Sequence, residues 1–219
     1  MVRPLRNIAS QERYGEALLL LAAFYLLGDA GLWVARLAEL VFIMILLLII
    51  SHPAVPRPLK WTAWVASSVS AVLTFTRAYE GTPATVTLGA ASTLVVVVIT
   101  IVAVLRRLLA HTDVTVSTVL GAFLCYALIG FGAAFLYITV DALTGQPFFT
   151  QGPQPEANYI YFSMVTLTTV GYGDLTAGTA LAKRLVVIEA LVGQVFLVVL
   201  VARLVSLWKA PLRNLNRQD

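Results

Sequence analysis

Six long runs of apolar residues, separated by short polar breaks, dominate the sequence. A helix of about 20 apolar residues crosses the ~30 Å hydrocarbon core of a bilayer, so these runs predict membrane-spanning helices. The runs are residues 14–27, 32–51, 61–79, 84–105, 115–140 and 181–208. A shorter apolar stretch, residues 159–168, would extend only about 15 Å as a helix and would enter a membrane without crossing it.

The first run is the shortest of the six, and an alternative interpretation joins residues 14–51 into one tilted helix and leaves five spans. Six spans with both termini in the cytoplasm put most basic residues on the inner side, as the positive-inside rule requires. Those inner residues are Arg3, Arg6, Arg13, Arg57, Lys60, Arg106, Arg107, Lys209, Arg213 and Arg217. Five spans would place the arginine-rich N-terminus outside, so six are favoured.

Composition supports this interpretation and excludes a soluble domain. Apolar residues make up 59% of the 219 residues and charged residues 12%, against roughly 45–50% and 25% in globular proteins. The mean hydropathy is +0.88. The predicted fold is therefore an all-α integral membrane protein. The net charge of +4 could suggest a nucleic-acid partner in a soluble protein. Here the basic residues flank apolar runs, so we expect membrane lipids and no nucleic acid.

One motif carries candidate chemistry. Residues 168–174, TTVGYGD, lie between the fifth and last apolar runs and resemble the selectivity filter of tetrameric potassium channels, T-V-G-Y-G, residue for residue. The resemblance implies a pore domain over residues 111–208, made of an outer helix, a turret, a re-entrant pore helix, the filter and an inner helix. It also implies a homotetramer, because one filter segment cannot surround an ion.

The residue types of this motif suit the binding of K⁺ by main-chain carbonyls. A dehydrating cation needs oxygen ligands, and rings of main-chain carbonyls supply them. Successive carbonyls alternate in direction along an ordinary strand, but glycines at positive φ can turn neighbouring carbonyls to one side. The resemblance assigns the K⁺ ligands to the carbonyls of Thr169, Val170, Gly171 and Tyr172 and to the Thr169 hydroxyl, within a filter that ends at Gly173. It places Asp174 at the outer mouth, where carboxylates attract cations.

The stretch 159–168 is predicted to be the pore helix, with Asn158 as its N-cap. Its C-terminal end would direct the negative end of the helix dipole toward the ion path. Some family members carry a glutamate behind the filter, paired with the aspartate that follows it. Val165 occupies that position here, so that carboxyl pair is not expected.

Two residues of the last run are candidates for gating. Gly193 lies near the middle of the run and could be a hinge, although close packing of two helices is an equal alternative. Glu189 is ionisable at membrane depth, which marks a candidate functional residue, and we expect it to face protein behind the filter.

Residues 1–110 are predicted to form a four-helix domain with the layout of a voltage sensor but without its arginine repeat. Residues 84–105 contain no Lys or Arg, and Arg106 and Arg107 are adjacent, so they cannot share one helical face. We therefore expect weak or absent voltage dependence. Arg36 and Glu39 can pair within one helix. Residues 209–219 are expected to be a short cytoplasmic tail.

The sequence thus predicts a potassium channel that is not an enzyme and needs no cofactor, with K⁺ as the permeant ion. The expected location is a prokaryotic plasma membrane, because no processing signal is recognised. A potassium-transporter subunit and a poorly selective cation channel remain alternatives. Transporters usually show internal repeats, and we find none.

Overall fold

The structure is a computed structural model, described here for residues 14–27, 32–51, 55–77, 82–110 and 115–207. The described residues form seven α-helices. These are α1 (Tyr14–Leu27), α2 (Leu32–Ile50), α3 (Arg57–Arg77), α4 (Pro83–Ala110), α5 (Val116–Thr144), α6 (Glu156–Leu167) and α7 (Ala180–Leu207). The all-helical fold is confirmed over this part of the chain. The predicted tail, residues 209–219, lies outside the described residues.

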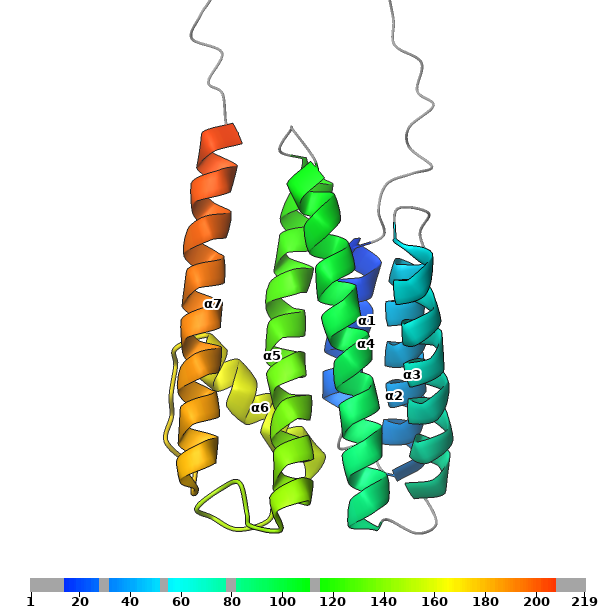
Figure 1. Cartoon of the computed structure of the whole chain (residues 1–219). Coiled ribbons are helices and arrows are strands. Elements are labelled where there is room, and N and C mark those ends of the chain that lie inside the picture. The colour runs from blue at the N-terminus through cyan, green and yellow to red at the C-terminus, as the bar shows by residue number, and fades with distance from the viewer. Residues whose placement is uncertain (1–13, 28–31, 52–54, 78–81, 111–114, 208–219) are drawn as a thin grey trace, which may run out of the picture.

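The six longer helices stand side by side and run alternately in opposite directions, whereas α6 is short and oblique (Figure 1). Helix α7 stands at one edge of the bundle and α3 at the other. Helix α6 packs against both α5 and α7 near the end of the bundle where α7 begins. Helices α1 and α2 are separate and pack against each other, so the interpretation as one long helix over residues 14–51 is wrong.

Local signals explain the ends of α5. Thr115 accepts a hydrogen bond from the Thr118 backbone N–H, and the Thr118 hydroxyl accepts one from the Thr115 backbone N–H, which together satisfy donors at the helix start. Gly145 ends the helix at φ 63°, a left-handed conformation that glycine adopts without a steric penalty. Helix α5 therefore continues four residues beyond the apolar run that predicted it.

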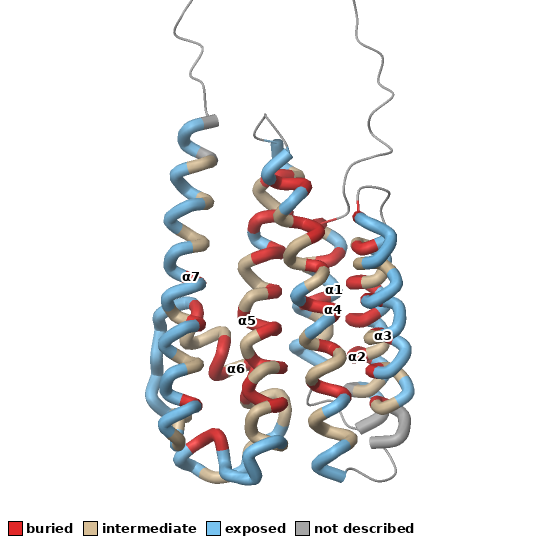
Figure 2. The backbone as a smooth tube through the Cα atoms, in the orientation of Figure 1, coloured by how far each residue is buried: buried red, intermediate tan, exposed pale blue. Residues whose placement is uncertain are grey.

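The core lies between α1, α2, α4 and α5, where the buried residues gather (Figure 2). Phe24, Phe42 and Phe131 form its aromatic centre, with ring centroids 4.8 Å apart for Phe24–Phe42 and 5.6 Å apart for Phe42–Phe131. In contrast, α7 is exposed along most of its length. Its exposed side chains include Val187, Leu191 and other apolar residues, so this helix presents apolar surface that the single chain does not cover.

Three of the described helices are long and apolar enough to cross a membrane: Pro83–Ala110, Val116–Thr144 and Ala180–Arg203. Two arginines tie helices together at the end of the bundle where α4 ends. The Arg107 guanidinium donates to the Ile49 carbonyl of α2 at 3.0 Å. Arg203 of α7 donates to the carbonyls of Leu108 and Leu109, at 2.8 and 2.9 Å. Such cations satisfy the free carbonyls at helix C-termini.

Candidate functional site

Helix α6 leads directly into the candidate site, residues 168–174. It begins at Glu156, with Pro155 at the N-cap and no side-chain cap, so the prediction of Asn158 as N-cap was wrong and the helix starts three residues before the predicted stretch. The acidic Glu156 in the first turn complements the positive end of the helix dipole. After α6 the chain runs along the side of α7 that faces away from α1–α4 and returns to the start of α7 (Figure 1).

Every second residue of the following segment has a left-handed backbone: Thr169 at φ 61°, Gly171 at 56° and Gly173 at 80°. The positive φ predicted for the two glycines is confirmed. The positive φ of Thr169 was not predicted, because only glycine adopts this conformation freely. A non-glycine residue held there costs roughly 1–3 kcal/mol, and such strain occurs at functional sites.

Hydrogen bonds fix the direction of three carbonyls. The backbone N–H groups of Thr169, Val170 and Gly171 all donate to the last carbonyls of α6, at 2.9, 3.0 and 3.3 Å. The described residues contain no cis peptide, and in a trans peptide the C=O points opposite to the N–H. The carbonyls of residues 168, 169 and 170 therefore all point away from the end of α6. Residues 168–174 are exposed in the single chain.

The end of the segment at Asp174 is held by α6 and by the loop before it. Asp174 accepts a hydrogen bond from the Tyr161 hydroxyl at 2.7 Å. The Gln151 side chain donates to the Asp174 carbonyl at 3.0 Å and accepts from the Thr176 N–H at 3.1 Å. Asp174 therefore pairs with a phenol, and Val165 offers it no carboxyl partner, as expected. This hydrogen bond raises the pKa of Tyr161 to about 12.

Aromatic packing supports the same loop from behind. Phe148 and Phe149 are buried, and the Phe149 ring lies 4.8 Å from Tyr159 and 5.1 Å from Phe162, both of α6. Phe148 stacks on Tyr137 of α5 at 4.5 Å. This contact was not predicted from the sequence, and the adjacent pair Phe148 and Phe149 was the signal that could have identified it.

Leu167, the last residue of α6, is enclosed by both neighbouring helices. Its carbonyl accepts a hydrogen bond from the Tyr126 hydroxyl of α5 at 2.7 Å. A Cβ added to Gly193 of α7 would lie 2.4 Å from Leu167 Cδ1, and one added to Gly130 of α5 would lie 3.2 Å from Cδ2. The structure therefore gives Gly193 a close-packing role, and the hinge remains a prediction.

Glu189 of α7 is buried against α6 one helical turn before Leu167, and faces protein as expected. Its carboxyl group contacts the Tyr137 hydroxyl of α5 and the Ser163 hydroxyl of α6. The same serine hydroxyl lies 2.6 Å from the Gly130 carbonyl. One side chain of α7 thus links α7 to α5 and α6.

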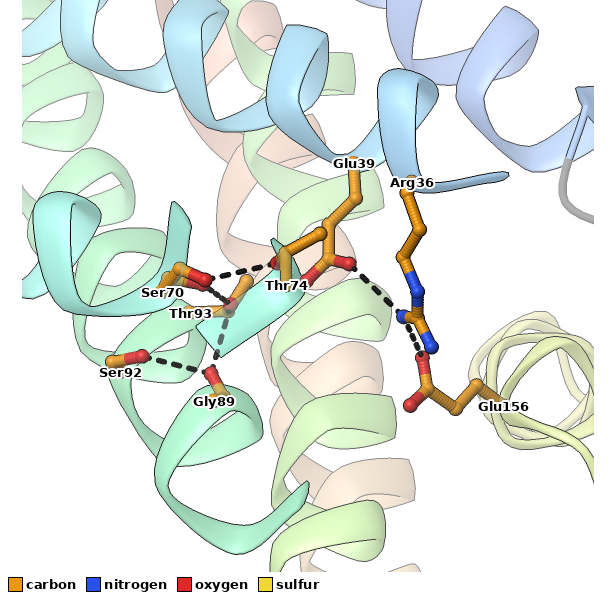
Figure 3. A network of polar contacts seen from close by, with 8 residues as sticks. All are labelled: Arg36, Glu39, Ser70, Thr74, Gly89, Ser92, Thr93 and Glu156. Atoms are coloured by element: carbon orange, nitrogen blue, oxygen red, sulfur yellow. Dashed lines mark hydrogen bonds and ion pairs between the residues drawn. The ribbon is translucent and has the colours of Figure 1, made fainter. Parts of the chain in front are cut away.

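The start of α6 is joined to α2 by an ion pair. Arg36 of α2 lies 3.4 Å from Glu39 and 3.8 Å from Glu156 (Figure 3), so the predicted Arg36–Glu39 pair is confirmed and extends to α6. Ser70 of α3 and Thr93 of α4 share a hydrogen bond of 2.6 Å nearby. The described residues contain no group of three or more His, Cys, Asp or Glu that could hold a metal.

A comparison with known protein families matches the same part of the chain, and two known proteins are similar to part of it. Residues 156–209, about a quarter of the sequence, match the family model described as an ion channel. The chain is 39% identical over an alignment of 83 residues to "Two pore potassium channel c" of Oryza sativa subsp. japonica, which covers 33% of this chain and 18% of that protein. It is 39% identical over an alignment of 75 residues to "Two-pore potassium channel 4" of Arabidopsis thaliana, which covers 32% of this chain and 26% of that protein.

The matched segments thus span about a fifth to a quarter of the length of these curated relatives. The family match begins at the first residue of α6 and extends through the left-handed segment and α7. The similarity to ion channels therefore includes the elements that form the candidate site.

Proposed function

We propose that this protein is a potassium-selective ion channel, in which main-chain oxygens of residues 169–172 replace the hydration shell of K⁺. The observation that carries the proposal is the common direction of the carbonyls of residues 168–170, away from α6 and toward the open side of the chain. The match of residues 156–209 to an ion-channel family and the similarity of part of the chain to two potassium channels support it. Asp174, at the outer end, would attract cations to the entrance.

The proposed assembly is a homotetramer with the filter segments around a four-fold axis. The sequence contains the TVGYG motif once, whereas the relatives are named two-pore channels, so more copies of this chain are needed to form a ring. The exposed apolar surface of α7 would be buried between subunits. Irregular backbone at membrane depth is tolerated where protein or water surrounds it, and a tetramer would provide that surrounding.

The proposed topology has six spans in a plasma membrane, with both termini in the cytoplasm. The alternating directions of the six longer helices support it, because α1 begins and α7 ends on the same side of the bundle (Figure 1). In this arrangement residues 1–110 form a peripheral four-helix domain and residues 111–208 the pore domain. The negative end of the α6 dipole would favour a cation below the filter.

A K⁺ flux assay in liposomes tests the proposal through Gly171→Ala, with Gly145→Ala as a matched control. Both glycines are left-handed, at φ 56° and 63°, and neither has an atom within 4 Å of an added Cβ, so the two variants introduce similar backbone strain. We expect Gly171→Ala to lose K⁺ flux or K⁺/Na⁺ selectivity, and Gly145→Ala to keep both. Unchanged, barium-insensitive K⁺ flux in Gly171→Ala would contradict the proposal.

A further inference from the structure

The Glu189 carboxyl group lies inside the protein, where α5, α6 and α7 meet. The residue is only 5% exposed and lies nine residues after the start of α7, about 14 Å along the helix axis. One carboxyl oxygen contacts the Tyr137 hydroxyl, and the other lies 2.5 Å from the Ser163 hydroxyl. The ion path that we propose does not use this group directly.

The number of hydrogens available for the contacts of Ser163 indicates whether the Glu189 carboxyl group is ionised or neutral. Its hydroxyl oxygen lies 2.5 Å from Glu189 Oε1 and 2.6 Å from the Gly130 carbonyl oxygen. A serine hydroxyl has one hydrogen to donate. If Glu189 were ionised, one of these two short oxygen–oxygen contacts would contain no hydrogen and would be repulsive.

A proton on Glu189 Oε1 removes that conflict. The carboxyl group then donates to Ser163, Ser163 donates to the Gly130 carbonyl, and the Tyr137 hydroxyl donates to the other carboxyl oxygen. Each of the three contacts then contains one hydrogen, and no two acceptor oxygens face each other.

The electrostatic surroundings favour the same state. The ionisable side chains that face Glu189 are two phenols of α5, Tyr137 and Tyr126, and α6 contributes the uncharged Ser163. Among the described residues, no Lys or Arg forms an ion pair with Glu189. Burial of a carboxylate without a cation is costly, and such groups become neutral instead.

We propose that Glu189 carries a proton and that the hydrogen-bond chain Tyr137–Glu189–Ser163–Gly130 makes it a positioning residue for the filter. This inference rests on the proposed function. Ser163 lies one helical turn before Leu167, and the carbonyls of Val165 and Thr166 hold the N–H groups of residues 169–171. Movement of α6 at Ser163 would therefore displace the carbonyls that are proposed to bind K⁺.

Infrared spectroscopy of the intact protein in bilayers at neutral pH tests the protonation. We expect a C=O stretching band of a protonated carboxylic acid in the wild type, absent from Glu189→Gln and retained in Glu16→Gln. Glu16, on the exposed side of α1, is the matched control. Identical wild-type and Glu189→Gln spectra in this region would refute the protonation.

Flux variants test the positioning role. Glutamine can donate to Ser163 and accept from Tyr137 as the neutral acid does, so Glu189→Gln should keep K⁺ flux and K⁺/Na⁺ selectivity within about twofold. Glu189→Leu and Ser163→Ala leave buried polar groups unpaired and should let the end of α6 move, so we expect each to lower K⁺ flux or K⁺/Na⁺ selectivity about tenfold. The inference would be overturned if Glu189→Gln lost as much K⁺ flux or selectivity as Glu189→Leu. It would also be overturned if Glu189→Leu or Ser163→Ala kept the flux and selectivity of the wild type.

The two proposals fail in different ways. The infrared band does not depend on ion conduction, so a missing band together with K⁺-selective flux would refute the protonation and leave the proposed function intact. A protonated Glu189 in a wild-type protein without K⁺ flux would refute the proposed function and with it the positioning role.

Discussion

Substitution of Gly193 by alanine tests the packing that holds the end of α6. The added Cβ would lie 2.4 Å from Leu167 Cδ1 and 3.4 Å from Cγ, so the leucine side chain must move. Leu167 is 2% exposed, and its other methyl group faces Gly130, where an added Cβ would lie 3.2 Å away. The side chain therefore has little space into which it can shift.

Overpacking of this kind costs about 1–3 kcal/mol. For a chain of this length, that corresponds to a fall of roughly 2–12 °C in the apparent unfolding temperature. Gly132→Ala is the matched control, because its Cβ would make an ordinary contact of 3.4 Å with Val97. We expect that variant to be as stable as the wild type, since alanine also favours the helix.

A double-mutant cycle with Leu167→Ala separates packing from hinge motion. Leu167→Ala alone should cost about 2–5 kcal/mol, but it removes the methyl group that the Cβ added by Gly193→Ala would strike. Gly193→Ala should therefore cost at least about 1 kcal/mol less in the Leu167→Ala background, measured by thermal unfolding of the assembled protein in detergent. Equal costs in both backgrounds would refute the packing argument, and loss of flux independent of Leu167 would support a hinge.

Two further predictions concern the outer end of the site and the first four helices. The contact with Asp174 raises the pKa of Tyr161 to about 12 from 10.0, so its stabilising effect is complete below pH 10 and is lost as the pH rises through 12. Ultraviolet titration of the wild type minus Tyr161→Phe should show one phenolate forming near pH 12, and titration near pH 10 would contradict the contact. Arg106 and Arg107 cannot form a charge repeat, and each charge moved across the membrane field contributes only ~2.3 kcal/mol per 100 mV. We therefore expect the conductance to depend weakly on voltage. A steep voltage dependence that is abolished by neutralising both arginines would contradict this prediction.

Much of the fold could be predicted from the sequence, because membrane-spanning helices leave long apolar runs. Helix α1 begins and ends where the first apolar run does. The ends of α3 and α4 were less predictable, since both helices extend beyond the apolar run into residues such as Arg57 and Arg107. Arg107, near the end of α4, donates to the Ile49 carbonyl of α2, a contact that hydropathy does not report.

The parts of the candidate site whose backbone conformation requires glycine could be predicted from the sequence. The parts that depend on contacts between distant elements could not. Glycines at positions 171 and 173 indicated their positive φ, because other residues rarely adopt it. The same conformation at Thr169 could not be predicted, since it depends on hydrogen bonds to the end of α6. The contacts of Glu189 and Tyr161 also join elements distant in sequence, so only the folded arrangement reveals them.

The most direct test of the central claim is single-channel recording from the purified protein in planar bilayers, with K⁺ on one side and Na⁺ on the other. The account predicts unitary current steps and a reversal potential displaced strongly in the direction of K⁺ selectivity. A reversal potential near zero, or transport of K⁺ without unitary steps, would contradict the claim that main-chain oxygens of residues 169–172 form a selective pore.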